Sequence, residues 1–225
     1  MNILLTNDDG IQAKGLQALL SAVPQGCKVM VVAPANEKSA SSHSISLGQK
    51  LRVEEYISEE VHYYAVHGTP ADCVKFALSE LREVYPDLII SGINQGANTG
   101  VSVYYSGTIS AAREGVINRV SAIAVSLCSR TFDDFTAAVE VTRNLIAGYQ
   151  SGILPKDILL NVNIPPIPFE EIRGIKITKQ AASHFIEEFI PEKVHDGKKV
   201  YSLAGEIELY DPDGTSDEEA VAARY

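Results

Sequence analysis

The sequence has 225 residues, 45% of them hydrophobic, which is enough to bury one sizeable core with a smaller appended lobe. Its 19 basic and 29 acidic side chains give a net charge of -10 at pH 7, which argues against binding to a nucleic acid polymer through a general basic surface. The three cysteines form no CxxC pair, no basic leader opens the chain, and no apolar run approaches the roughly 18 residues that span a bilayer. We therefore expect a cytoplasmic protein with reduced thiols and no contact with a membrane.

The first apolar run, residues 3–5, is typical of a buried strand and is soon followed by two adjacent carboxylates, Asp8 and Asp9. Neighbouring residues of a continuing strand point to opposite faces, so both carboxylates reach one site only if the chain turns near Asn7. Two carboxylates this close repel each other unless a cation lies beside them. The pair therefore has two interpretations: ligands of a divalent metal, or a polar loop that caps a helix beginning near Ala13.

Helical and extended patterns alternate after this turn. Residues 14–23 carry apolar side chains at helical spacing, and residues 28–33 form a second buried strand. The order strand, helix, strand predicts a parallel pair joined by a right-handed crossover. The serine-rich loop after the second strand leaves the same edge of the sheet as the two carboxylates, where such sheets keep their sites.

Residues 45–55 and 61–66 look extended and indicate a hairpin or an excursion at the edge of the sheet. A clearer signal follows, because Thr69 suits a helix N-cap, Pro70 the first helical position and Asp72 the positive end of the helix dipole. We interpret this motif as a well-capped helix rather than as a catalytic group.

The segment from residue 92 to residue 108 is rich in glycine and follows another buried strand, residues 87–91. Glycines let a ligand approach the main chain, and Asn94 and Asn98 offer neutral oxygens that coordinate or orient it. The alternative is a long flexible loop, but the length of the segment and its position after a buried strand favour a ligand loop.

The same segment ends in two hydroxyls that flank a glycine, directly before a helical pattern. The unpaired N–H groups at such a helix start form a phosphate site that needs no basic residue, whereas the plainer interpretation is an ordinary serine cap. The residues concerned are Ser106, Gly107 and Thr108.

The α/β core is expected to end after a strand at residues 121–126, an amphipathic helix at residues 132–149 and a strand at residues 157–164. A further strand is expected at residues 174–178.

Residues 185–210 then mix aromatic and charged side chains, with Asp196 and Gly197 as a tight-turn signal between two extended arms. Because a two-stranded hairpin is seldom stable alone in water, we predict that this one packs on another subunit. Ser216 has the capping-box spacing for a short helix over residues 217–224.

Three segments thus leave the carboxyl ends of parallel strands and should converge: the acidic pair Asp8 and Asp9, the serine loop around Ser39 and the glycine loop around Asn94. They offer carboxylate, hydroxyl and amide oxygens without a cluster of histidine or cysteine, which points to Mg²⁺ or Mn²⁺ rather than Zn²⁺. A hard cation beside a phosphate site indicates phosphoryl chemistry.

Four segments, TNDDGI, VVAPANEKSASSHS, HGTPADCV and SGINQGANTGVSVYYSGTISAAREG, resemble the signature segments of the SurE family, the survival-protein phosphatases that act as 5'- and 3'-nucleotidases. The resemblance covers the chain from residue 1 to about 165, and the tail more loosely. It implies a Rossmann-like three-layer α/β core with a mostly parallel sheet over residues 1–165. It also implies a C-terminal β-hairpin and extended oligomerisation segment over residues 166–225, in a homodimer or homotetramer.

The resemblance also implies a set of site residues for a nucleoside monophosphate substrate, and in some members activity on short polyphosphate. One divalent cation per subunit would be bound by Asp8, Asp9, Ser39 and Asn94, of which the two aspartates are catalytic. The substrate phosphate would be held by Asn98, Ser106, Gly107 and Thr108.

Two departures from the family pattern stand out. The family usually has Ser-Gly where this chain has Ser39 and Ala40, so we expect the backbone of the loop to differ slightly while the hydroxyl is kept. The family pattern also continues into a terminal strand, whereas this sequence stops at Arg224 and Tyr225. Whether the chain is a truncated or a short form, its oligomer contacts are less well defined than its active site.

We predict hydrolysis of nucleoside 5'-monophosphates, with 3'-monophosphates as further substrates, by a metal-activated water that Asp8 or Asp9 orients. An aspartyl-phosphate intermediate is the second mechanism, but haloacid-dehalogenase-type phosphatases use alternating Asp-x-Asp rather than an adjacent pair. The alternatives from other classes are a non-catalytic nucleotide-binding module and a receiver-like Mg²⁺-binding signalling domain. The receiver needs a phosphoacceptor aspartate where Ser91 stands and a lysine after the strand at residues 121–126. This sequence has neither residue at those positions. We interpret His43 as a solvated loop histidine and His67 as structural.

Overall fold

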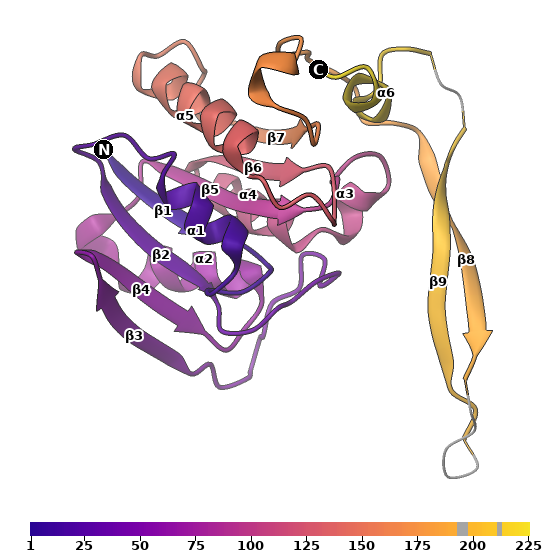
Figure 1. Ribbon diagram of the computed structural model, residues 1–225. Coiled ribbons are helices and arrows are strands. Elements are labelled where there is room, and N and C mark those ends of the chain that lie inside the picture. Colours follow the sequence, from indigo (N-terminus) through magenta and orange to yellow (C-terminus); the bar gives the residue numbers. More distant parts are fainter. Residues whose placement is uncertain (193–197, 211–212) are drawn as a thin grey trace.

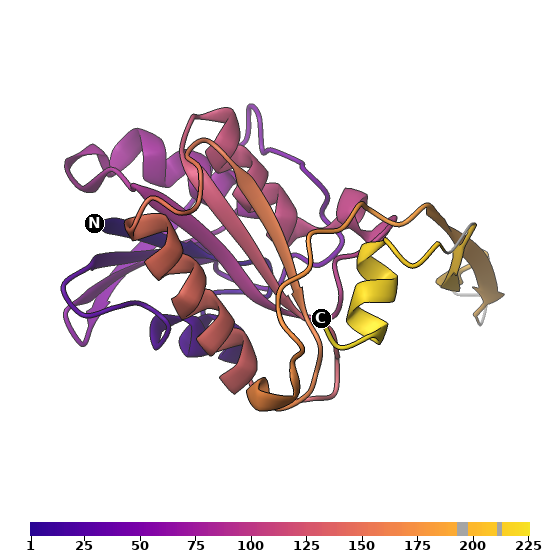
Figure 2. The ribbon, with the colours of Figure 1, turned by 90° about the horizontal axis from the view of Figure 1, so that it is seen from above.

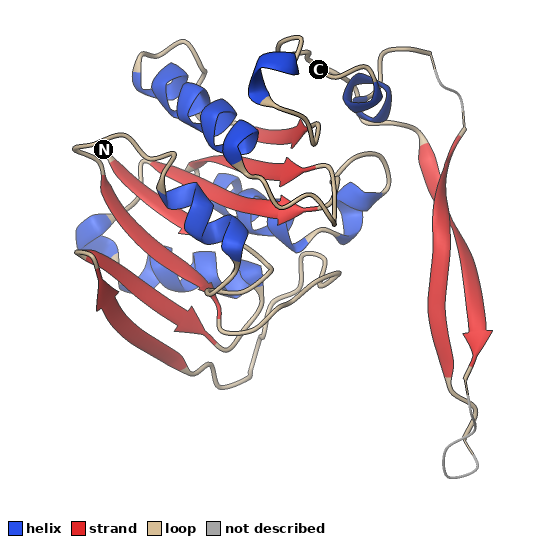
Figure 3. Cartoon of the chain, viewed as in Figure 1, coloured by secondary structure: helices blue, strands red, loops and turns tan. Residues whose placement is uncertain are grey.

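The structure, a computed structural model, describes residues 1–192, 198–210 and 213–225. It contains a central seven-stranded sheet and a separate two-stranded sheet (Figure 1, Figure 3). The strands are β1 (Asn2–Thr6), β2 (Lys28–Pro34), β3 (Val53–Ser58), β4 (Val61–Val66), β5 (Leu88–Gln95), β6 (Ser121–Leu127), β7 (Leu159–Ile164), β8 (Ser183–Pro191) and β9 (Tyr201–Leu209). The helices are α1 (Lys14–Leu20), α2 (Pro70–Glu80), α3 (Ser102–Tyr105), α4 (Gly107–Ile117), α5 (Thr136–Gln150) and α6 (Asp217–Ala222), with 3-10 turns at Arg82–Val84 and Phe169–Glu171.

The large sheet confirms the predicted α/β class. Its order is β3-β4-β2-β1-β5-β6-β7, and every neighbouring pair is parallel except β3 with β4. In β1, Leu5 lies opposite Val31 of β2 on one side and Ile90 of β5 on the other. The chain order reverses between β1 and β5, so the loops after β1, β2 and β5 leave the sheet around one crevice, where open α/β sheets bind ligands.

Helices cover both faces of this sheet, which gives the predicted three layers (Figure 2). On one face α1 and α5 pack on a core that includes Ile3, Leu5 and Leu16. On the other face α2 and α4 pack on a second core that includes Leu4 and Ile109. Successive residues of β1 therefore serve opposite cores, as expected of a strand buried on both faces.

Strands β8 and β9 pair with each other in an antiparallel hairpin that stands away from the body of the molecule (Figure 1). The hairpin predicted from the sequence is thus confirmed, while its predicted turn at Asp196 and Gly197 lies outside the described residues. Its packing on another subunit and the division of the chain at residue 165 stay predictions. Among the described helices, none is both long and apolar enough to cross a membrane.

Two predicted strands are wrong or too long. Residues 45–52 precede β3 without joining the sheet, because Gly48 takes a positive φ of 77° and Ser46 is bonded to the start of α2. Residues 174–178 form no strand; Gly174 has a φ of 139°, and Ile177 is 98% exposed.

The helices also differ from the prediction in two places within the core. Helix α5 begins at Thr136 rather than at residue 132, since Ser129 holds the preceding turn by accepting the Phe132 N–H. The glycine loop contains a short helix, α3, that its composition did not predict.

Candidate active site

The acidic pair follows β1, and the chain turns where the sequence predicted. The Asn7 side chain donates to the Gly10 carbonyl at 2.9 Å, and Gly10 adopts a φ of 103°, which a residue with a side chain rarely does. The alternative interpretation as a helix cap is wrong, because Ala13 is the N-cap of α1 and no side chain caps it. The two aspartates are therefore left for another role.

Asp8 lies against the N-terminus of α4. Its Oδ1 accepts the Thr108 hydroxyl at 2.5 Å, and the Thr108 main-chain N–H also bonds the carboxylate. A Cβ on Gly107 would lie 2.7 Å from the Cβ of Asp8, so only glycine permits this approach. The helix start that the sequence assigned to a phosphate thus already holds the carboxylate of Asp8.

Burial and repulsion by neighbouring carboxylates raise the pKa values of both aspartates. Burial raises the pKa of Asp8, although hydrogen bonds from Thr108 oppose the shift. Burial raises the pKa of Asp9 to about 7, with further contributions from the charges of Asp8 and Glu37. A cation among these carboxylates would favour their charged forms, so the arrangement fits a divalent metal. Glu37 is an acidic neighbour that the sequence reasoning missed, although it stands two residues before Ser39.

The turn that carries Asp8 and Asp9 is called the acidic turn. The serine loop, defined here as residues 35–52 between β2 and β3, is hydrogen-bonded to it. The Lys38 N–H donates to the Asp8 carbonyl at 2.7 Å. The Ser39 hydroxyl donates to Glu37 Oε1 at 2.5 Å, which leaves the lone pairs of the Ser39 oxygen for a cation.

Asn94 stands near the end of β5, beside β1, where Thr6 lies opposite Ser91. Its side-chain nitrogen donates to the Gly96 carbonyl at 2.8 Å, and its side-chain oxygen is the atom suited to a cation. Among the described residues, no three or more His, Cys, Asp and Glu side chains are placed to hold a metal ion. A metal here would therefore need the hydroxyl and amide oxygens as well as the carboxylates.

Asn98 lies in the glycine loop and is hydrogen-bonded to residues of strands β6 and β7. Its side chain donates to Ser126 Oγ at 2.9 Å, and its main-chain N–H donates to Asn163 Oδ1 at 2.8 Å. Asn161 in turn donates to the Asn98 carbonyl at 2.8 Å. The side chain of Asn98 is thus buried and engaged, and its contact with phosphate stays a prediction. Sequence reasoning missed Asn161 and Asn163, whose only signal is their alternation in the last parallel strand.

Ser106 is the N-cap of α4, and its hydroxyl accepts the Ile109 N–H at 3.1 Å. Ser106 is therefore a helix cap, as the plainer interpretation predicted. A contact between its hydroxyl and a phosphate stays a prediction. The main-chain N–H groups at the start of the helix are the remaining donors.

The interpretation of His43 as a solvated histidine is wrong. Its Nε2 lies 2.9 Å from Glu114 Oε2, and this carboxylate, in α4, is only 3% exposed. The two residues are 71 positions apart, so no local spacing could have revealed the pair. His67 is structural in the predicted sense, because it pairs with Glu54 at 2.8 Å beside Arg52.

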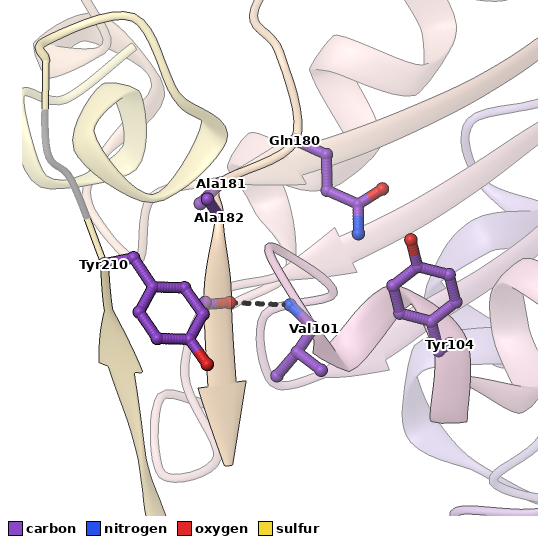
Figure 4. A pocket seen from close by; sticks show the side chains of 7 residues that line it. Val101, Tyr104, Gln180, Ala181, Ala182 and Tyr210 are labelled. Carbon is purple, nitrogen blue, oxygen red and sulfur yellow. Dashed lines mark hydrogen bonds between the residues drawn. The ribbon is translucent and has the colours of Figure 1, made fainter.

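A hollow of about 370 Å³ lies elsewhere, where the base of the hairpin meets α3 (Figure 4). The Val101 N–H donates to Ser183 Oγ at 2.8 Å beside it. None of the predicted ligand residues lines this hollow, which is formed by Val101, Tyr104, Gln180, Ala181, Ala182, Ser183 and Tyr210.

Three comparisons relate the chain to known proteins. The family model described as survival protein SurE matches residues 3–187. A protein of Chlorobaculum tepidum named 5'-nucleotidase SurE is 43% identical over 225 residues, covering 100% of this chain and 86% of the relative. A protein of Synechococcus sp. (strain JA-3-3Ab) with the same name is 44% identical over 230 residues, covering 100% of this chain and 89% of the relative. The crystal structure of the SurE protein from Aquifex aeolicus matches with a TM-score of 0.84 at 35% identity, covering 100% of this chain and 90% of that one.

Proposed function

This chain belongs to the SurE family, and from that premise we propose that it is a metal-dependent phosphomonoesterase that hydrolyses nucleoside 5'-monophosphates to nucleoside and phosphate. The nucleotidase activity is supported by full-length relatives that carry the name 5'-nucleotidase. Metal dependence is supported by one observation above all: buried Asp8 and half-buried Asp9 lie side by side between the serine loop and the start of α4. Activity on 3'-monophosphates is part of the proposal.

We propose one Mg²⁺ or Mn²⁺ per subunit, because such a cation prefers oxygen ligands. When bound, it would polarise a phosphoryl oxygen and lower the pKa of water, which makes hydroxide available as the nucleophile at phosphorus. Its ligands would be Asp8, Asp9, Ser39 and Asn94.

The two aspartates are held differently, and we assign them different tasks. Asp8 is fixed by two hydrogen bonds from Thr108 and sets the geometry of the site. The shifts of Asp9 come from burial and repulsion alone, so it is the freer carboxylate, and we assign to it the orientation of the attacking water. The phosphate would be held by Asn98, Ser106, Gly107 and Thr108, mainly through N–H groups.

The rival functions have weaker support. A receiver-like signalling domain needs a phosphoacceptor aspartate at the position in β5 where Ser91 stands. A non-catalytic nucleotide-binding module predicts binding without turnover. The exposed hairpin supports a homodimer or homotetramer. We also propose a cytoplasmic location, which the unpaired cysteines support.

The experiment measures phosphate release from AMP, GMP and an aryl phosphate, with and without Mg²⁺ or Mn²⁺. We expect metal-dependent release that Asp9→Ala abolishes while circular dichroism shows an intact fold. Asp133→Ala is the matched control, because Asp133 is exposed and its side-chain contacts, with Lys14 and Gln95, lie at the surface. Metal binding without release from any substrate would support the binding module instead.

A single turnover of a nucleoside thiophosphate made chiral with oxygen isotopes separates the two mechanisms. Direct attack by water is one displacement and inverts the configuration at phosphorus. Retention would require two displacements through an aspartyl-phosphate and would contradict direct attack.

A further inference from the structure

The serine loop is held in place by contacts from outside itself. The Lys38 N–H bonds the Asp8 carbonyl, and the Ser42 N–H donates to the Tyr105 carbonyl at the end of α3, at 3.1 Å. Ala40 and Ser42 both take left-handed backbone conformations, with φ values of 53° and 51°. Residues with a Cβ adopt this conformation only where surrounding contacts force it. The loop therefore depends on its anchors for its shape.

Glu114 provides the most deeply buried of these anchors. Its Oε2 bonds His43 of the serine loop at 2.9 Å. Its Oε1 pairs with Lys75 of α2 at 2.8 Å and accepts the Asn118 side chain at 2.9 Å. One carboxylate thus joins the serine loop to α2 and to α4, the helix that begins beside the acidic turn.

Asp72 provides a second anchor farther along the loop. It accepts the Ser46 N–H at 3.0 Å through Oδ1 and the Ser46 hydroxyl at 2.7 Å through Oδ2. Thr69, the N-cap of α2, donates its hydroxyl to the Ser44 carbonyl at 2.7 Å. The cap predicted for α2 is confirmed, and the same two residues also hold the serine loop.

We propose that Glu114, acting through His43, is a positioning residue that fixes the serine loop against the acidic turn and so places Ser39 for the metal. This inference rests on the proposed metal-dependent activity. His43 follows Ser39 by four residues, so losing its anchor frees the segment that carries the hydroxyl. Glu114 itself stays held by Lys75 and Asn118, so the helix is expected to keep its place.

The test compares three variants of the full chain after removal of metal. His43→Ala removes the contact, and His43→Gln keeps a donor of similar reach. His62→Ala is the matched control, because His62 pairs with Glu55 at 3.4 Å in the β3–β4 hairpin, outside the loop. Calorimetry gives the Kd for Mn²⁺, and hydrogen exchange reports the amides of Lys38 and Ser42.

We expect His43→Ala to raise the Kd for Mn²⁺ about tenfold or more, the usual effect of losing a group that orients a metal ligand. Exchange at Lys38 and Ser42 should accelerate in the same variant. His43→Gln should return both readouts towards wild type, and His62→Ala should match wild type. Loss of general stability alone would not give this pattern of rescue.

The inference is wrong if His43→Ala keeps the wild-type Kd and exchange rates, or if His43→Gln is as impaired as His43→Ala. A wild type that binds Mn²⁺ but releases no phosphate from AMP overturns only the nucleotidase proposal, because neither readout needs turnover. A wild type that binds no Mn²⁺ overturns both.

Discussion

The carboxyl edge of the large sheet and the C-terminal hairpin differ in where their apolar side chains lie. Leu5, just before the acidic turn, is fully buried, whereas Phe189 and Leu203 of the hairpin are 64% and 60% exposed. The core of the same chain therefore holds the strand that positions the site. The hairpin exposes apolar surface on an isolated pair of strands, which is marginal in water and supports the oligomer proposed above.

The largest expected effect separates the two regions directly. Leu5→Ala should lower the free energy of unfolding by about 2–5 kcal/mol, because it leaves a cavity in a close-packed core. Phe189→Ala should change it by about 0.5 kcal/mol or less in dilute protein, as an exposed substitution does. Urea denaturation measures both, and light scattering should show Phe189→Ala shifting towards smaller species. Equal losses from the two substitutions would mean that the hairpin is part of the intrachain core.

The next effect concerns the contact between the acidic turn and α4. Gly107→Ala would place a methyl group 2.7 Å from the Cβ of Asp8, so it should cost about 1–3 kcal/mol of stability and most of the phosphate release. Gly148→Ala in α5 is the control, because its Cβ would meet Leu154 at an ordinary 3.4 Å. Full activity in Gly107→Ala would show that Asp8 can move from the helix start without consequence.

A pH-dependent effect is expected at Glu114. Burial raises the pKa of Glu114, but bonds from Lys75, His43 and Asn118 outweigh it, so the pKa lies below its ordinary value of 4.5. The charged form then stabilises the fold above pH 4.5, and this contribution is lost as pH falls through the lowered pKa. Glu114→Gln should therefore cost about 1–2 kcal/mol at pH 7.

The measurement is urea denaturation of wild type and Glu114→Gln between pH 7 and pH 3. The difference between them should shrink below pH 4.5. Glu140→Gln, in a surface pair with Arg143, is the control and should show little difference at any pH. A difference for Glu114→Gln that stays constant with pH would contradict the assignment.

The smallest effect concerns the backbone of the serine loop. Ala40 has a φ of 53°, so Ala40→Gly should remove strain and raise stability by about 0.5 kcal/mol after the entropy cost of glycine. Ala147→Gly, on the exposed side of α5, should instead lower stability by about 1 kcal/mol. Chemical denaturation measures both, and a loss for Ala40→Gly would show that Ala40 is not strained.

Much of the fold could be predicted because its signals are local. The apolar runs of β1 and β2 and the helix between them determine the parallel pair, and Thr69 marks the start of α2 with its own cap. The acidic turn could also be predicted, because adjacent aspartates after a buried strand are unusual in any context. The observed α/β core confirms this part of the prediction.

The rest depends on contacts between distant residues. Glu114 meets His43 across 71 positions, and Asn163 meets Asn98 across 65, so neither pair has a pattern in the sequence. The strand expected at residues 174–178 is the reverse case, because it has a local pattern but lacks a distant partner. Its composition suits a strand, but these residues pair with no strand in the described part of the chain.

Helix α4 carries the residue that approaches Asp8 at one end and the carboxylate that holds the serine loop near the other, within eleven residues. Both contacts are therefore mechanically linked, since an α-helix of this length moves as a unit. A laboratory evolution experiment that seeks new substrates would have little freedom on the buried face of α4. We expect accepted substitutions to accumulate in the loops around it, where one contact can change without disturbing the other.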